Sequence, residues 1–421
     1  MIVPHPWLLV FSVAALLLVL GATSGLVNAR LMISEPLVCA AFGVAIGPLG
    51  LGLLELHPAH DPVAAAFLRE AARLTLAIAV LAAAIRLPRG WLRQHWGGLA
   101  LSLGPGMLLM WAAGMLVTAF SFALPWLVCA LIGAIIAPTD PVLSASVVSG
   151  DLARRAVPAD LRHAITAESG INDGLAEPFV MLPVVALTSA GTAISWHDAS
   201  IWALHAVLWE VGASVLLGGV AGFIACRITR WAHRQAGAER SSLLTIALAL
   251  ALATLTGLQA IGANGVLGAF VAGAWLNAGY EDEYQERQER FNEAVTRFFD
   301  LPVMILFGAA IPWAAWQAMG WRALAFAAGV LFLRRIPAWL LLYRGLSWTR
   351  RLPEALFLGW FGPVGAAAMF YALETQGMTR LDMLWPIVSL AVAASVVAHG
   401  MTGTHLSALL GRRFARRQRS R

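Results

Sequence analysis

The stretch Ala137-Pro-Thr-Asp-Pro-Val142 (APTDPV) lies inside an apolar run that extends over about residues 124–149. Pro138 and Pro141 lack a backbone N–H and disfavour helical geometry in the residue before them, so they interrupt a helix at this point. At membrane depth, an interrupted helix is tolerated only where its free backbone groups are buried in protein or line a cavity. The sequence therefore predicts that Thr139 and Asp140, between the two prolines, lie at a polar site inside a membrane protein.

The composition around this stretch is that of a membrane protein. Of 421 residues, 59% are hydrophobic and 12% charged, whereas soluble domains carry about 25% charged residues. Runs of ~20 apolar residues predict membrane-spanning helices, and the alternating ~10-residue pattern of a transmembrane barrel is absent from the sequence. We therefore expect an all-α polytopic membrane protein with about thirteen transmembrane helices, over residues 6–28, 31–53, 63–86, 97–122, 124–149, 163–188, 201–230, 242–260, 262–279, 291–312, 322–344, 354–374 and 384–410.

The distribution of arginine predicts the orientation. All 29 basic residues are arginines, and basic residues collect in cytoplasmic connections. With the N-terminus outside, the connections on the outer side hold only Arg322 and Arg380. The arginine-rich connections and the basic tail 411–421 then face the cytoplasm. This pattern indicates that the arginines contact a lipid bilayer rather than a nucleic acid. We expect the membrane to be a bacterial inner membrane. Exposed tryptophans fit belts at the two interfaces, among them Trp7, Trp126, Trp202, Trp313, Trp321 and Trp385.

A second polar cluster follows one predicted span later. Within Glu168-Ser-Gly-Ile-Asn-Asp173, Glu168 and Asn172 are four residues apart, as are Ser169 and Asp173, so they share one helical face. Ionisable residues inside a membrane are functional candidates by default. Helix capping by Asp140 and interhelical bonding by Asn172 are the structural alternatives, but they do not account for all the carboxylates together.

The chemistry of this cluster suits a small cation. Carboxylate and hydroxyl oxygens prefer hard cations, and the same carboxylate also binds a proton. Competition of the two ions for one carboxylate would couple their movements. Glu177 lies one turn further on, either as an accessory proton site or as a protonated carboxyl bonded to a neighbour.

A second interruption, around Gly362 and Pro363, lies in the predicted span 354–374. Paired broken helices in corresponding positions are typical of inverted-repeat transporters with a site near the midplane. Arg334 and Arg335 lie in the preceding span, and a buried arginine needs a carboxylate. We expect Glu168 to pair with Arg335 or Arg334, while the other arginine extends toward the membrane interface. In the span 63–86, Arg69, Glu70 and Arg73 allow a local Glu70–Arg73 pair.

In order, APTDPV, ESGINDG, the span with Arg335, GANGVLGAFVAG (262–273) and AHGMTG (398–403) resemble the electroneutral monovalent cation:proton antiporters, the sodium/proton exchanger family, in its bacterial form. The resemblance implies a homodimer whose mobile core moves like an elevator. Its helices would divide into dimerisation-type helices (1–96 and 242–312), a linking helix (201–230) and core helices (97–190 and 322–410).

The same resemblance implies the residue roles. Asp173 would bind the cation or the proton, with Thr139 and Ser169 as further ligands, Asn172 and Asp140 shaping the site, and Arg335 paired with Glu168. The Asn-Asp order favours one cation per proton. We therefore expect a secondary-active antiporter for Na⁺, with Li⁺ or K⁺ as alternatives, which is not an enzyme and needs no cofactor. A cation channel with a carboxylate-lined pore and an ion-coupled symporter of an organic solute are the alternative functions.

Overall fold

The computed structural model describes residues 6–26, 32–189, 196–235, 243–278, 298–349 and 351–418, and all regular elements within them are helices. The polar stretch 280–290 and several arginines used for the orientation (Arg30, Arg240, Arg287, Arg290, Arg297, Arg350, Arg419 and Arg421) lie outside these ranges. The predicted all-α class is confirmed.

The helices of the first half are α1 (Pro6–Leu26), α2 (Glu35–Ile46), α3 (Pro62–Arg86), α4 (Trp91–Gln94), α5 (Trp96–Leu101), the π-helical segment Ser102–Gly106, α6 (Met107–Phe122), α7 (Trp126–Ile135), α8 (Ala145–Val148), α9 (Gly150–Ala156) and α10 (Ala159–Thr188). Those of the second half are α11 (Trp196–His205), the π-helical segment Ala206–Ala213, α12 (Ser214–Gln235), α13 (Leu243–Ala260), α14 (Gly265–Asn277), the helix Phe298–Ala309, α16 (Trp313–Met319), α17 (Trp321–Phe332), α18 (Ile336–Leu342), α19 (Leu352–Trp360), α20 (Ala366–Thr379) and α21 (Leu384–Gln418).

Several helices are long and apolar enough to cross a membrane. Within the described ranges there are five, or six if the helix Phe298–Ala309 and α16, which are bent by 61° at their junction, form one span. Five shorter apolar helices accompany them, including α7, α13 and α14. Each predicted span overlaps a helix, but length and composition do not establish a count of thirteen, which stays a prediction.

Both predicted interruptions are present. The chain leaves helical geometry after α7 and resumes it at α8, and it does so again between α19 and α20. A third break was not predicted. It separates α17 from α18 at residues 333–335, where Pro337 has no N–H to offer the carbonyl of Leu333. Arg334 and Arg335 lie in this third break.

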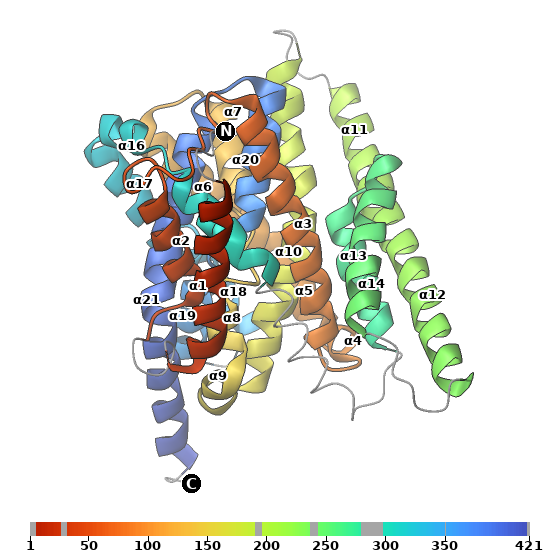
Figure 1. Cartoon of the computed structure of the whole chain (residues 1–421). Helices are drawn as coiled ribbons and strands as arrows, with labels where there is room; N and C mark the ends of the chain where they lie inside the picture. Colours follow the sequence, from red (N-terminus) through yellow and green to blue (C-terminus); the bar gives the residue numbers. More distant parts are fainter. Residues whose placement is uncertain are drawn as a thin grey trace.

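The packing places these breaks beside one another. In Figure 1, α11 to α14 lie along one side of the molecule, and α16, α17 and α21 lie on the opposite side. Helix α3 packs against α10, α14 and α20, and α10 packs against α7. Glycines permit the close approach: a Cβ at Gly174 of α10 would lie 2.8 Å from the backbone of Leu267 in α14. Helix α10, which carries the second polar cluster, is therefore held between the two broken regions and α14.

One predicted interface tryptophan is internal. Trp385 at the start of α21 has 0% exposure, and its indole N–H donates to the carbonyl of Ala310 at 3.1 Å. Trp7 and Trp321 are 85% and 71% exposed, as an interface position requires. The predicted interface position of Trp385 is wrong. A tryptophan at the end of a span can either contact lipid or donate to a neighbouring helix end, and only the packing of the helices decides which occurs.

Candidate functional site

Asp140 joins the two broken regions. Its Oδ1 accepts hydrogen bonds from the backbone N–H groups of Val142 (2.7 Å) and Leu143 (2.9 Å), and its Oδ2 accepts one from Ala366 (2.7 Å). Its own N–H donates to the carbonyl of Pro363 at 2.8 Å. Because Ala366 is the first residue of α20, Asp140 caps that half-helix from the other broken region. Both its oxygens are engaged in holding the crossing together.

Arg334 donates hydrogen bonds to carbonyls at the C-terminal ends of the half-helices α7 and α19. Its Nη1 donates to the carbonyls of Ile136 (2.8 Å) and Ala137 (2.9 Å), which follow the last turn of α7, and its Nη2 donates to the carbonyl of Gly362. The side chain is 2% exposed, so the expectation that one arginine extends to the interface is wrong. Carbonyls at and just after a helix C-terminus have no partner in their own helix, and this guanidinium supplies donors to three that directly follow α7 and α19.

The two residues therefore place charge where the half-helices need it. A helix N-terminus favours negative charge and a C-terminus positive charge. Asp140 lies at the N-terminus of α20, and Arg334 lies at the C-terminal ends of α7 and α19. This arrangement compensates the backbone groups that the prolines left without partners.

Arg335, rather than Arg334, contacts Glu168. Two parallel hydrogen bonds run from Arg335 Nη1 to Glu168 Oε1 (2.5 Å) and from Nη2 to Oε2 (2.9 Å). Arg335 Nε also donates to the carbonyl of Leu358 at 2.9 Å, and its guanidinium lies 4.6 Å from the ring centre of Trp339. The planar fork of arginine suits this two-point contact. The pair links α10 to the segment between α17 and α18.

Thr139, Ser169 and Asn172 form a small polar network at the first break. Asn172 Nδ2 donates to Thr139 Oγ1 at 2.9 Å, Asn172 Oδ1 accepts from the N–H of Thr139 at 3.1 Å, and the hydroxyls of Thr139 and Ser169 are 3.0 Å apart. All three residues are buried. The network holds hydroxyl oxygens of two different segments close together, on the face of α10 that also carries Asp173.

Asp173 differs from the other carboxylates of this region. Its exposure is 0%, and within the described ranges neither carboxyl oxygen has a hydrogen-bond partner. Its backbone is fixed, however: the Tyr371 hydroxyl donates to its carbonyl at 2.7 Å. The next carbonyl, of Gly174, accepts from Asn264 Nδ2 at 2.7 Å, because Pro178 has no N–H to bond it. Asp173 is thus a rigidly placed carboxyl that lacks a partner.

Several charged residues lie near Glu177, which is one turn after Asp173 on α10. Arg73 Nε donates to Glu70 Oε2 at 3.0 Å, the predicted local pair of α3, and Arg69 Nη1 lies 3.2 Å from Glu374 Oε2 on α20. Glu177 is largely buried, and Arg73 and Glu374 are among the charges that act on it. The Arg69–Glu374 pair therefore connects α3 to α20 beside Glu177.

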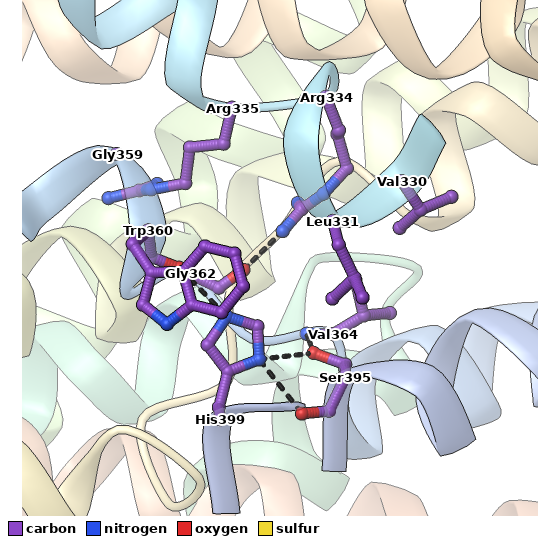
Figure 2. A pocket seen from close by; sticks show the side chains of 10 residues that line it. All are labelled: Val330, Leu331, Arg334, Arg335, Gly359, Trp360, Gly362, Val364, Ser395 and His399. Atoms are coloured by element: carbon purple, nitrogen blue, oxygen red, sulfur yellow. Dashed lines mark hydrogen bonds between the residues drawn. The ribbon is translucent and has the colours of Figure 1, made fainter. Parts of the chain in front are cut away.

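His399 lines a small pocket at the second break. Figure 2 shows it beneath Trp360 and beside Ser395, with Arg334 reaching Gly362 from the opposite wall. The two ring nitrogens of His399 each lie 2.8 Å from a carbonyl, of Trp360 and of Ser395. The Ser395 hydroxyl accepts from the N–H of Val364 at 2.7 Å. These contacts bind α21 to the backbone of the break.

Comparison with known proteins gives the family of the chain. Residues 14–409 match the family described as "Sodium/hydrogen exchanger, transmembrane". The chain belongs to the sodium/hydrogen exchanger family. This is a family of transporters rather than enzymes, so the chain is an integral membrane protein.

The chain is similar to several proteins that are named as antiporters. It is 29% identical to a Na⁺/H⁺ antiporter of Saccharomyces cerevisiae over 91% of this chain and 42% of that protein. It is 24% identical to a K⁺/H⁺ antiporter, NhaP2, of Shewanella sp. over 94% of this chain and 66% of that protein. The chain spans about half the length of the first yeast relatives that it matches, from Saccharomyces cerevisiae and Zygosaccharomyces rouxii.

A solved structure shares the fold of this chain. The sodium proton antiporter MjNhaP1 of Methanocaldococcus jannaschii matches with a TM-score of 0.69 at 18% identity, over 95% of this chain and 99% of that one. The two chains therefore have the same overall fold.

Sequence reasoning missed three structural roles. It predicts that Arg334 either pairs with Glu168 or extends toward the membrane interface, and it assigns no structural contact to His399 or Asn264. A signal for Asn264 existed, since Pro178 frees the carbonyl of Gly174. The position of Asn264 opposite that carbonyl is set by packing between α10 and α14.

Proposed function

We propose that this protein exchanges a monovalent cation for a proton across a membrane, and that Asp173 is the carboxyl that the two ions share. The observation that carries the proposal is its unpartnered, fully buried carboxyl, beside the Thr139–Ser169–Asn172 network. A carboxylate in such a position is strongly disfavoured unless it is neutralised. Either a bound cation or a bound proton neutralises it.

This requirement couples the two fluxes. If Asp173 were charged and had no ion bound, the site would bury an uncompensated charge. The protein therefore switches the side of the membrane to which the site is open only when a proton or a cation is bound. The hydroxyls of Thr139 and Ser169, which are 3.0 Å apart, would turn from each other toward the cation. Asn172 holds Thr139 in place through its side-chain amide. Oxygen ligands of this kind suit Na⁺, Li⁺ or K⁺ rather than a soft metal, and the cycle needs no cofactor.

The contacts around the site support movement of a rigid core. Asp140, Arg334 and the Glu168–Arg335 pair bind the broken regions and α10 into one unit. We place residues 97–190 and 322–410 in the moving core and residues 1–96 and 242–312 in dimerisation-type helices, with 201–230 as the linking helix and 411–421 as a cytoplasmic tail. The Arg69–Glu374 pair crosses this boundary and would break when the core moves. The protein would act as a homodimer.

The charge balance and arginine distribution complete the proposal. A single titrating carboxyl that takes one proton or one monovalent cation gives electroneutral exchange. The concentration of arginine in the inner connections favours an external N-terminus and a cytoplasmic C-terminus. The membrane would be a bacterial inner membrane, and the physiological role pH homeostasis.

Exchange is tested in proteoliposomes that carry a preset pH difference. Na⁺, Li⁺, K⁺ and choline are added in turn, with the membrane potential clamped. We expect Na⁺ or K⁺ to move protons independently of the clamp, and Asp173→Asn to abolish this while the variant elutes as the native protein does. Coupled exchange in Asp173→Asn would overturn the assignment of the site. Cation flux without proton movement would favour a channel, and proton movement that depends on an organic solute would favour a symporter.

A further inference from the structure

A second carboxyl shares the features of Asp173. Asp300 lies in the first turn of the helix Phe298–Ala309, has 0% exposure, and neither of its oxygens has a hydrogen-bond partner within the described ranges. It lies inside the predicted span 291–312, but sequence reasoning did not single it out. The protein therefore contains two buried carboxyls without partners, on different helices.

The helix that carries Asp300 is fixed on several sides. The Thr75 hydroxyl of α3 donates to the carbonyl of Phe299 at 3.2 Å. Toward α2, a Cβ at Gly43 would lie 3.0 Å from the Cα of Gly308, so the two backbones are in contact. At the other end, Trp385 donates to the carbonyl of Ala310. Asp300 is thus enclosed by packing rather than by a loose loop end.

The groups that act electrostatically on Asp300 do not include a cation among the described residues. Asp140 is the charged group whose field reaches it. On α2, Cys39 lies within the field of Asp300 and also of Glu35. Glu168, which is buried to the same degree, has Arg335 as a partner. A negative charge on Asp300 would therefore face another carboxylate, in a site from which water is excluded.

A proton suits this position better than a metal ion. A monovalent cation needs several oxygen ligands around it, as Thr139, Ser169 and Asp173 offer elsewhere. At Asp300 the nearby hydroxyl of Thr75 already donates to a carbonyl, and Cys39 offers sulfur, which is a soft ligand. A proton needs only the carboxyl itself.

We propose that Asp300 is a second proton-binding carboxyl, and that it holds its proton while the crossing region that contains Asp140 keeps the position that it has in this structure. The linkage to movement rests on the proposed function, in which Asp140 moves with the core and Asp300 belongs to the dimerisation-type helices. Displacement of Asp140 removes the opposing charge, and Asp300 then releases its proton more readily. The carboxyl would thus report the position of the core through its protonation.

Infrared spectroscopy of the purified protein tests the proton directly. We compare the native protein with Asp300→Asn, Asp300→Glu and the control Asp382→Asn, which changes an exposed carboxyl between α20 and α21. We expect the carbonyl stretch of one protonated carboxyl at neutral pH to be lost in Asp300→Asn, to return shifted in Asp300→Glu, and to be unchanged in the control. A spectrum of Asp300→Asn identical to the native one across the pH range would overturn the inference.

Transport separates this inference from the proposed function. If the protonation of Asp300 follows the position of the core, Asp300→Asn should change the pH profile of exchange while exchange through Asp173 stays electroneutral. Exchange with an unchanged pH profile and an unchanged spectrum would reject the role of Asp300 alone. Absence of exchange in the native protein, with the infrared band lost in Asp300→Asn, would reject the proposed function and keep the proton site. If Asp300→Asn does not fold, an unshifted band in Asp300→Glu would reject the site.

Discussion

Replacing one member of the Glu168–Arg335 pair should destabilise the protein more than replacing both. The two side chains are 2% and 3% exposed, and removing one partner of a buried pair costs about 3–5 kcal/mol because the other charge stays buried. In Glu168→Gln, Arg335 keeps its bond to Leu358 and its contact with the Trp339 ring. We therefore expect the lower value, about 3 kcal/mol, which is roughly a hundredfold in the folded-to-unfolded ratio.

The two single variants should respond differently to pH. In Arg335→Met the remaining Glu168 carboxyl can be neutralised by a proton, so the loss of stability should shrink as the pH falls. In Glu168→Gln the remaining guanidinium stays charged, and the loss should persist at acid pH. Unfolding by SDS in mixed micelles, followed by circular dichroism at two pH values, measures both effects.

The double variant provides the decisive comparison. Glu168→Gln/Arg335→Met leaves no uncompensated charge, so its destabilisation should be smaller than the sum of the singles by about 2 kcal/mol or more. A double variant whose loss equals that sum would show that the two side chains do not depend on each other. A pH-independent loss in Arg335→Met would show that Glu168 is not the charge left behind.

Two further substitutions examine the crossing and the boundary of the core. Gly365→Ala should lower stability and exchange, because a Cβ there would overlap the Asp140 carboxyl. The control Gly377→Ala, whose Cβ would meet no atom within 4 Å, should stabilise α20 by up to about 1 kcal/mol. Equal thermal unfolding temperatures of the two variants would contradict this. Glu374→Gln removes the partner of Arg69 on α20 and leaves Glu70 as its partner on α3. Since Glu374 and Arg69 are 25% and 31% exposed, stability should change by no more than about 1 kcal/mol while the apparent cation affinity changes in the exchange assay. An unaltered affinity would argue that the pair does not respond to movement of the core.

The interruptions could be predicted because their cause is local. Pro138 and Pro141 remove backbone donors wherever they occur, and Gly362-Pro363 does so again. The third break at residues 333–335 was not predicted, although Pro337 gave a signal for it. One of its two arginines was expected to pair with Glu168 and the other to extend toward the membrane interface, but Arg334 binds carbonyls just after α7 that lie close only once the helices cross.

The site was predictable in part for the same reason. The spacing of Glu168, Ser169, Asn172 and Asp173 places them on one helix face, which the periodicity of a helix fixes without any tertiary information. Asp300 gave a weaker signal, that of a single ionisable residue inside the predicted span 291–312. Its complete burial, beside the contact of Phe299 with α3, is set by packing.

The sequence by itself determined that this chain is a helical membrane protein, that helices break near Pro138, Pro141 and Pro363, and that Asp140, Glu168 and Asp173 lie inside predicted spans. These properties follow from hydrophobicity, proline chemistry and helical period, which act over a few residues. The tertiary structure decided which charge meets which partner: Asp140 the N-terminus of α20, Arg334 the end of α7, Arg335 the Glu168 carboxylate, and no described side chain for Asp173 or Asp300. Partners separated by hundreds of residues are chosen by packing, because a buried charge is stabilised only by the groups that the fold brings within hydrogen-bonding distance.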